Sequence, residues 1–181
     1  MELLDIVDED GNPTGETVDR EVAHARGIRH RTSHVWIARR RNHKVELLLQ
    51  KRCMTKDSHP GCYDISSAGH IPAGVGFVES ALRELQEELG ITAQPGELIY
   101  CGVRKGMYED MFYGRRFIDN QVSNVYLLWE NDLEVGDYQI QESEIECVRY
   151  MEFEECCQKV QQNSIPNCIS LRELQMLKAK F

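Results

Sequence analysis

Three glutamates near the middle of the chain have the type and spacing of ligands for a hard divalent cation. Glu84, Glu87 and Glu88 stand at i, i+3 and i+4, which places their carboxylates on one stripe of a helix. Clustered carboxylate oxygens suit Mg²⁺ or Mn²⁺, and these ions neutralise and bridge phosphate oxygens. A solvated acidic helix face has the same pattern, so the neighbouring elements must decide between the two interpretations.

The segment around these glutamates has the apolar periodicity of a helix over residues 77–89 that ends at Gly90. A glycine-rich loop, residues 69–76, comes directly before it, and an extended run, residues 63–68, comes before the loop. Such a joint can direct backbone groups and carboxylates to one point, which favours the metal site. The apolar positions expected to pack against a sheet are Val78, Ala81, Leu82, Leu85 and Leu89.

The rest of the chain predicts one mixed-sheet α/β domain over residues 1–181, because strands are interrupted by helices and no linker or repeat divides it. Residues 104–119 are expected to be loops, with Phe112, Tyr113 and Phe117 available to stack on a substrate base. Helices are expected from about residue 152 and over 169–180. Strands are expected at residues 3–7, 17–18, 33–38, 45–49, 63–68, 98–103, 122–129 and 145–150.

The composition excludes several partners. The formal net charge is −9, so nonspecific attraction to nucleic acid or to an anionic membrane is not expected. No run approaches the ~20 apolar residues of a membrane span. The first residues lack the features of a signal peptide, so a cytoplasmic location is expected. The seven cysteines contain no C-x-x-C pair, which favours free thiols in a reducing compartment.

The segment from Gly69 to Ile91 resembles the Nudix box. It reads GHIPAGVGFVESALRELQEELGI, against the pattern G-x5-E-x7-R-E-U-x-E-E-x-G-U with U apolar. Every specified position matches except Val75, which stands where the box has its first glutamate. The resemblance extends over roughly residues 3–155 and implies the Nudix α/β/α sandwich with a mixed β-sheet. It also implies a metal-dependent hydrolase that cleaves a diphosphate linkage in a nucleoside di- or triphosphate or a related X-linked diphosphate.

The same resemblance implies roles for the residues of the box. Glu84, Glu87 and Glu88 would bind Mg²⁺ or Mn²⁺, with the carbonyl of Ala68 as a further ligand. Glu87, Glu88 and Arg83 would act in catalysis, in which a metal-activated water attacks phosphorus. As solvent-facing acids, the glutamates are expected to contribute little to folding.

Other site residues follow from the segments outside the box. The resemblance implies Glu144, just before the strand at residue 145, as the preferred general base, because members of the family often carry an acid on that late loop; Glu109 and Asp110 are alternatives. Arg52, at the end of the strand that resembles the one ahead of the box, is expected to bind the small-molecule diphosphate substrate. A homodimer is left open.

The N-terminal half, with His30 to Trp36 as its clearest stretch, resembles the Nudix branch that contains type I isopentenyl-diphosphate isomerase. That isomerase uses a cysteine and a glutamate, whose positions here hold Ala68 and Gln121. Moving a double bond needs a proton donor and a proton acceptor of complementary acidity. Isomerase chemistry is therefore not expected.

His24, His30 and His70 match or approximate metal histidines of that isomerase, and Asp119 matches one of its acids. Two interpretations are open. The histidines and Asp119 form a second metal site, or His30 and His70 form hydrogen bonds in a polar cleft and contact the substrate phosphate. The polar cleft is the preferred interpretation.

Val75 raises a further alternative, a catalytically weak Nudix domain that binds a nucleotide or a partner. The intact glutamate triplet argues against it. We expect Glu79 to compensate for Val75 by pairing with Arg83 at i,i+4 and holding it in place.

Overall fold

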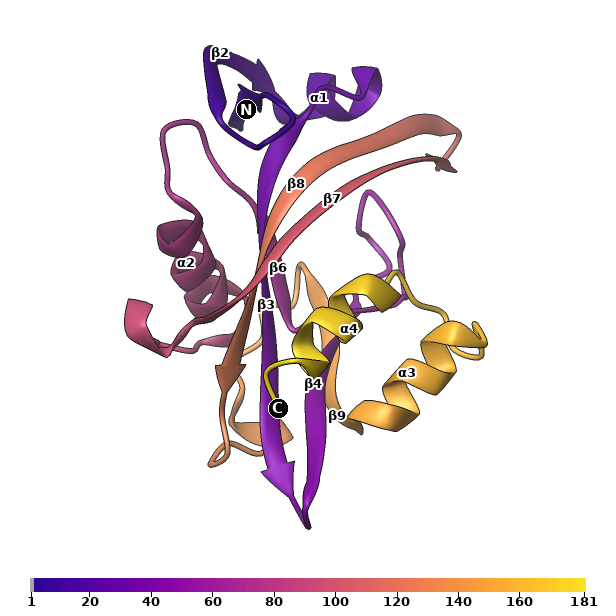
Figure 1. The fold of residues 1–181 in the computed structure, drawn as a ribbon. Coiled ribbons are helices and arrows are strands. Elements are labelled where there is room, and N and C mark those ends of the chain that lie inside the picture. Colours follow the sequence, from indigo (N-terminus) through magenta and orange to yellow (C-terminus); the bar gives the residue numbers. More distant parts are fainter. Residues whose placement is uncertain (1) are drawn as a thin grey trace.

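The computed structural model describes residues 2–181, and a twisted seven-stranded sheet runs through its middle (Figure 1). Its main path is β5-β4-β3-β8-β7, with β6 paired to β3 and β9 paired to β4. β3 and β8 run parallel, and the other pairs are antiparallel, so the sheet is mixed. The strands are β3 (His30–Arg41), β4 (Lys44–Arg52), β5 (Tyr63–Asp64), β6 (Ser67–His70), β7 (Ile99–Phe112), β8 (Arg115–Trp129) and β9 (Ile145–Glu152).

Helices cover both faces of this sheet, as Figure 1 shows. α2 (Phe77–Leu89) lies on one face, and α3 (Phe153–Gln161) and α4 (Leu171–Lys178) lie on the other. The prediction of an α/β/α sandwich with a mixed sheet is confirmed. A small hairpin, β1 (Leu3–Val7) with β2 (Pro13–Asp19), and α1 (Arg20–Arg26) precede the main sheet; two short 3₁₀ turns, η1 (Pro95–Glu97) and η2 (Val135–Asp137), lie in its connections.

The central strand β3 explains why the main sheet has an apolar core on each of its faces. Val35 and Ile37 pack under α2, whereas Trp36 and Ala38 pack against the C-terminal helices. Successive side chains of a strand point to opposite faces, so a strand covered on both faces is apolar throughout. The turn from β3 to β4 uses Asn42, whose φ of 49° is left-handed, as two-residue hairpin turns require.

The predicted helix over 77–89 agrees with α2 at both ends. Gly90 ends it in a left-handed conformation with φ 70°, and its N–H bonds the Gln86 carbonyl. The predicted loops at residues 104–119 are wrong. These residues form the outer part of the β7–β8 hairpin, which turns at Tyr113 and Gly114 and curves toward α1 (Figure 1). α1 is not anticipated either.

No helix within residues 2–181 combines the length and the apolar character that crossing a membrane would require.

Candidate active site

Most of the residues singled out in the sequence meet around one cavity of about 300 Å³. Its floor is one face of β3, β8 and β7, where Thr32 pairs with Ser123 and Ser123 with Arg104. The acidic stripe of α2 and β6 form a wall, and the segment after β4 forms the opposite rim. α1 and α4 each contribute further side chains. The cavity therefore draws on segments from both ends of the chain.

The acidic stripe of α2, which consists of Glu84, Glu87 and Glu88, lies very close to β6. A Cβ added at Gly69 would lie 2.2 Å from the Glu84 carboxyl carbon, so only glycine permits this approach. Glu84, Glu87 and Glu88 all line the cavity together with Ala68. The structure brings the four predicted metal-site residues to one place.

Glu88 is not solvent-facing, contrary to the expectation from the sequence. Only 6% of it is exposed, and its Oε2 has no hydrogen-bond partner among residues 2–181. Burial raises the pKa of Glu88 to about 8 and also raises the pKa of Glu84, whereas Glu87 is exposed. A buried carboxylate oxygen without a donor is costly unless a cation meets it. The donor set thus fits Mg²⁺ or Mn²⁺.

Arg83 does not line the cavity, but its guanidinium group contacts the carboxylates of Glu84 and Glu87. It donates to Glu84 at 2.6 Å and lies 3.9 Å from Glu87. The predicted pair between Glu79 and Arg83 is wrong: Glu79 is exposed and has no ion pair within the described residues. Arg83 is instead paired with two of the glutamates themselves.

The loop that contains Val75 is held by residues far away in the sequence. Asp5 accepts the Gly74 N–H at 2.9 Å and a hydrogen bond from Arg31 at 2.7 Å. Arg31 also donates to the Val75 carbonyl at 3.0 Å. Asp5 and Arg31 are both buried. This pair orders the loop through backbone groups, so the loop does not depend on an acid at position 75.

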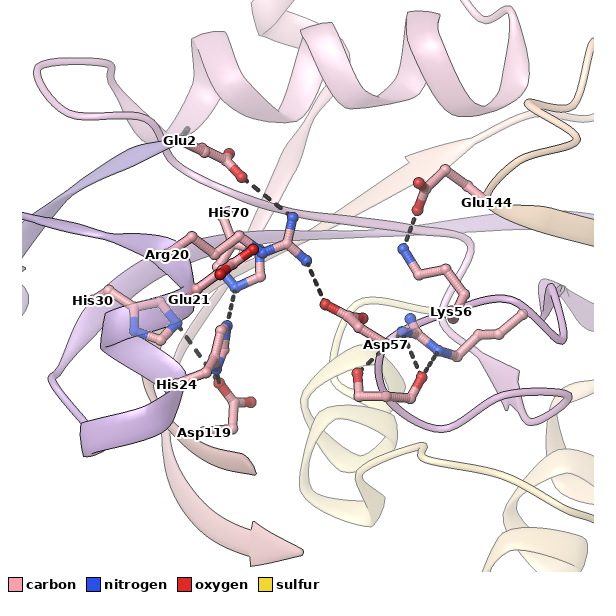
Figure 2. A network of polar contacts seen from close by, with 12 residues as sticks. Glu2, Arg20, Glu21, His24, His30, Lys56, Asp57, His70, Asp119 and Glu144 are labelled. Carbon is pink, nitrogen blue, oxygen red and sulfur yellow. Dashed lines mark hydrogen bonds and ion pairs between the residues drawn. The ribbon is translucent and has the colours of Figure 1, made fainter. Parts of the chain in front are cut away.

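A histidine cluster occupies the end of the cavity near α1 (Figure 2). The ligand nitrogens of His24, His30 and His70 lie within 4.8 Å of one another, and His24 Nε2 lies 2.9 Å from His70 Nε2. Asp119 Oδ1 lies 3.7 Å from His24 Nδ1 and 3.6 Å from His30 Nε2. The four side chains come from α1, β3, β6 and β8.

The electrostatics of this cluster suit a cation. Burial, followed by the neighbouring His30, lowers the pKa of His24 to about 4. Burial also lowers the pKa of His30 and His70, so all three rings are neutral at pH 7 and can act as ligands. His30 Nε2 and Asp119 Oδ1 are buried without a hydrogen-bond partner in residues 2–181. The polar-cleft interpretation leaves these two atoms unexplained, whereas a metal would bind both.

Every cationic side chain that lines the cavity is already paired with a carboxylate. Arg52 pairs with Asp64 at 3.2 Å and donates to the Ser58 carbonyl, so it fastens the segment after β4. The other pairs are Arg20 with Glu2 and Asp57, Lys56 with Glu144, and Arg104 with Glu173. Eight carboxylates face four such cations around the cavity. A polyanion would therefore be repelled unless metal ions offset the negative charge.

Of the three candidate bases, only Glu144 lines the cavity, where it pairs with Lys56 (Figure 2). Glu109 is bonded to Arg116 on the exposed part of the hairpin, and Asp110 is exposed beside it. Position therefore favours Glu144 over both alternatives.

Of the three aromatic candidates, only Phe117 lines the cavity, where it stacks on His24 with ring centroids 4.2 Å apart. Tyr113 donates to the Met54 carbonyl, and Phe112 packs edge-on against His59. The sequence interpretation did not single out Arg20, Lys56, Tyr108 and Glu173, which also line the cavity. Glu173 left one signal, a charged residue among the apolar positions of a short helix.

The two positions that distinguish the isomerase also lie in the cavity. Ala68 and Gln121 both line it, and they offer a methyl group and an amide. Neither exchanges a proton with carbon.

A mixed sheet between helices, with a helical glutamate triplet facing a glycine of the preceding strand, defines a protein of the Nudix fold. The family model described as the NUDIX domain matches residues 28–168, and the chain belongs to this family. A protein of Clostridium acetobutylicum named as an uncharacterized Nudix hydrolase is 40% identical over 144 residues, which are 80% of this chain and 66% of that protein. The chain thus spans just under two thirds of that relative.

Two further similarities are informative. The isopentenyl-diphosphate Delta-isomerase of Escherichia coli is 32% identical over 136 residues, 71% of this chain and 70% of that protein. The crystal structure of DR0079 from Deinococcus radiodurans has a TM-score of 0.66 at 16% identity and covers 92% of each chain. The second similarity concerns the fold alone.

Proposed function

We propose that this protein is a metal-dependent hydrolase that cleaves a diphosphate linkage in a small substrate, such as a nucleoside di- or triphosphate or a related X-linked diphosphate. The observation that carries the proposal is the unpartnered, buried oxygen of Glu88 within a cavity whose cations are all paired. A diphosphate that displaced the carboxylate partners of these cations would leave those carboxylates buried without a partner, which costs free energy. A metal bound to Glu84, Glu87 and Glu88 would attract the diphosphate without that cost.

Glu84, Glu87 and Glu88 would hold Mg²⁺ or Mn²⁺, with the Ala68 carbonyl beside them. The bound ion would lower the pKa of a water and take up charge on phosphate oxygens. Arg83 keeps two of the carboxylates in register, and Gly69 lets β6 approach them. The names of the clostridial relative and of the family support the hydrolytic reaction class.

Glu144 would accept the proton of the attacking water. Its partner Lys56 also lines the cavity, and the ion pair holds the Glu144 carboxylate there. Arg52 would act indirectly by fastening this rim through Ser58 and Asp64.

His24, His30 and His70 with Asp119 would hold a second divalent cation. Three neutral imidazoles and one carboxylate are a ligand set that suits Zn²⁺ or Mn²⁺. In this proposal His30 and His70 would serve as metal ligands, in place of the direct contact with substrate phosphate that the polar-cleft interpretation gives them.

The experiment is hydrolysis of a panel of diphosphates by metal-stripped protein, before and after Mg²⁺ or Mn²⁺ is added. We expect activity only with metal, and a loss of ~10²-fold or more in kcat for Glu87→Gln. Glu79→Gln is the matched control, because Glu79 lies on the same helix but is exposed and unpaired within the described chain. Metal-independent turnover, or full activity of folded Glu87→Gln, would refute the proposal.

A further inference from the structure

One cation on the cavity floor has a geometry that the proposed hydrolytic step does not use. Arg104, on β7, donates its Nε to Oε1 of Glu173 at 2.7 Å. Glu173 comes from α4, is 1% exposed, and also accepts from His34 Nδ1 and Trp36 Nε1, each at 2.8 Å. Three donors from two strands thus meet one buried carboxylate.

This carboxylate is a fixed negative charge. Burial alone would disfavour its ionised form, but His34, Arg104 and Trp36 outweigh burial and lower the pKa of Glu173 to about 2. A charge-assisted hydrogen bond in a buried setting restrains both partners. Glu173 therefore holds the Arg104 guanidinium in one orientation.

The other two nitrogens of that guanidinium remain available. Arg104 lines the cavity, and its Nη1 and Nη2 have no hydrogen-bond acceptor among residues 2–181. A Cβ added at Gly106 would lie 2.5 Å from Nη1, so the missing side chain at position 106 leaves the space that Nη1 occupies. The φ of Gly106 is outside the left-handed region, so the backbone there does not itself need glycine.

The surroundings of Arg104 are polar. Thr32, His34, Tyr108 and Gln121 line the same floor. A hydrocarbon group bound there would remove water from these polar groups without replacing its hydrogen bonds, which is costly. A group that carries oxygen acceptors would satisfy them, and a site built to hydrogen-bond a ligand discriminates strongly against analogues that lack the acceptor.

We infer that Arg104 is a specificity-determining residue, whose Nη1 and Nη2 bind an oxygen acceptor that the substrate carries beyond the diphosphate it presents to the metal. Glu173 is its positioning residue, and Gly106 makes room for it. The substrate class is a diphosphate attached to an oxygen-rich group, such as a sugar, a nucleoside or a further phosphate. This inference rests on the proposed function for the placement of the diphosphate.

The test compares ligands that share the diphosphate and differ beyond it. Beyond the diphosphate, ADP-ribose offers the oxygens of two sugars, ATP offers those of one sugar and a further phosphate, and isopentenyl diphosphate offers only hydrocarbon. Dissociation constants are measured by calorimetry with Ca²⁺ as the metal, and KM and kcat separately with Mg²⁺. The variants are Arg104→Gln, Gly106→Ala and Glu173→Gln. Arg116→Gln is the matched control, since Arg116 pairs with Glu109 on the exposed part of the same hairpin.

We expect Arg104→Gln and Gly106→Ala to weaken the preferred oxygen-bearing ligand about tenfold or more, and isopentenyl diphosphate less than about twofold. The loss should appear in KM rather than kcat. The ligand that loses most, ADP-ribose or ATP, identifies the source of the acceptor. Glu173→Gln should reproduce the loss in part, and Arg116→Gln should leave every constant unchanged.

The inference would be overturned if the Arg104 and Gly106 variants weakened all ligands equally or weakened none. It would also be overturned if the parent protein bound no oxygen-bearing diphosphate more tightly than isopentenyl diphosphate. The proposed function fails separately. If ligands bind with Ca²⁺ in the predicted order but none is hydrolysed with Mg²⁺, hydrolysis is refuted while the assignment of Arg104 stands.

Discussion

At the scale of single residues, two buried carboxylates show opposite electrostatics. Glu88 lacks a donor for Oε2, and burial raises its pKa to about 8. Glu173 has three donors, which outweigh its burial and lower its pKa to about 2. A carboxylate without a partner is suited to receive a cation, whereas one with several donors engaged serves to position other groups.

Glu88→Gln tests the first of these carboxylates. Because burial raises the pKa of Glu88 to about 8, its carboxyl group is mostly neutral at pH 7 in the metal-free protein, and replacing it with a neutral amide should leave that protein as stable as the parent. The variant should lose the rise in melting temperature that Mn²⁺ gives the parent. Differential scanning calorimetry with and without Mn²⁺ measures both effects. A variant that keeps the full Mn²⁺ response would show that Glu88 is not a ligand.

Glu173 predicts a pH dependence of stability. Its folded pKa, about 2, lies below the ordinary value of 4.5, so the stability it contributes is present above pH 4.5 and is lost as pH falls toward 2. Glu173→Gln should cost about 3 kcal/mol at neutral pH, and the deficit should shrink at pH 3. Urea unfolding at the two pH values measures this.

The control for that measurement is Glu154→Gln, because Glu154 pairs with Lys178 at the exposed surface of the neighbouring helix. It should change stability little at either pH. A deficit for Glu173→Gln that is the same at both pH values would mean that packing, rather than ionisation, explains its cost.

At the scale of elements, the N-terminal hairpin helps to order the loop that precedes α2. Asp5 on β1 and Arg31 on β3 hold the backbone of Gly74 and Val75, immediately before α2. The glutamate stripe begins about two turns further along the helix. Its position therefore depends on a strand far back in the chain, since Asp5 lies 69 residues before Gly74.

Asp5→Ala should therefore affect both stability and activity. It leaves Arg31 buried without its carboxylate partner, which costs about 3 kcal/mol, and it releases the loop. Chemical denaturation and kcat on a substrate that the parent hydrolyses measure the two effects. Glu79→Ala should change neither, because Glu79 is exposed. If Glu79→Ala lowers kcat and Asp5→Ala does not, the loop is ordered in another way.

At the scale of the whole molecule, the fold does not decide the reaction. The Nudix sandwich is shared with proteins named as hydrolases and with an isopentenyl-diphosphate isomerase that is 32% identical. The cavity has the acid stripe and the histidine cluster, but Ala68 and Gln121 cannot exchange protons with carbon. Individual residues of the cavity such as Ala68 and Gln121, and not the fold, therefore decide between the two reaction classes.

We predict that isopentenyl diphosphate is not isomerised. In deuterium oxide, with Mg²⁺ or Mn²⁺ present, no deuterium should enter the carbon skeleton of recovered substrate or product, since neither position can donate or accept the proton. Mass spectrometry of the recovered diphosphate checks this against a blank without protein. Protein-dependent incorporation would show that another group supplies the proton, with Cys168 the first to examine because it also lines the cavity.

Elements with a strong local pattern could be predicted from the amino-acid sequence. The limits of α2 follow from its apolar period and from Gly90, and the fixed spacing of the box placed Glu84, Glu87 and Glu88 on one stripe. The hairpin over residues 104–119 was missed for a physical reason. One face of it lines a polar cavity and the other meets solvent, so the alternation of polar and apolar residues that marks a strand is absent.

Contacts between residues that are far apart in the sequence depend on the tertiary structure and could not be predicted from local patterns. Three contacts illustrate this. Glu88 of α2 is buried, Asp5 of β1 holds the loop before α2, and Glu173 of α4 contacts Arg104 of β7. The histidines became a cluster because α1, β3 and β6 converge, and β8 brings Asp119 Oδ1 to 3.6 Å from His30 Nε2. Charge and hydrogen bonding act through space over a few ångströms, whereas sequence patterns report only neighbours along the chain.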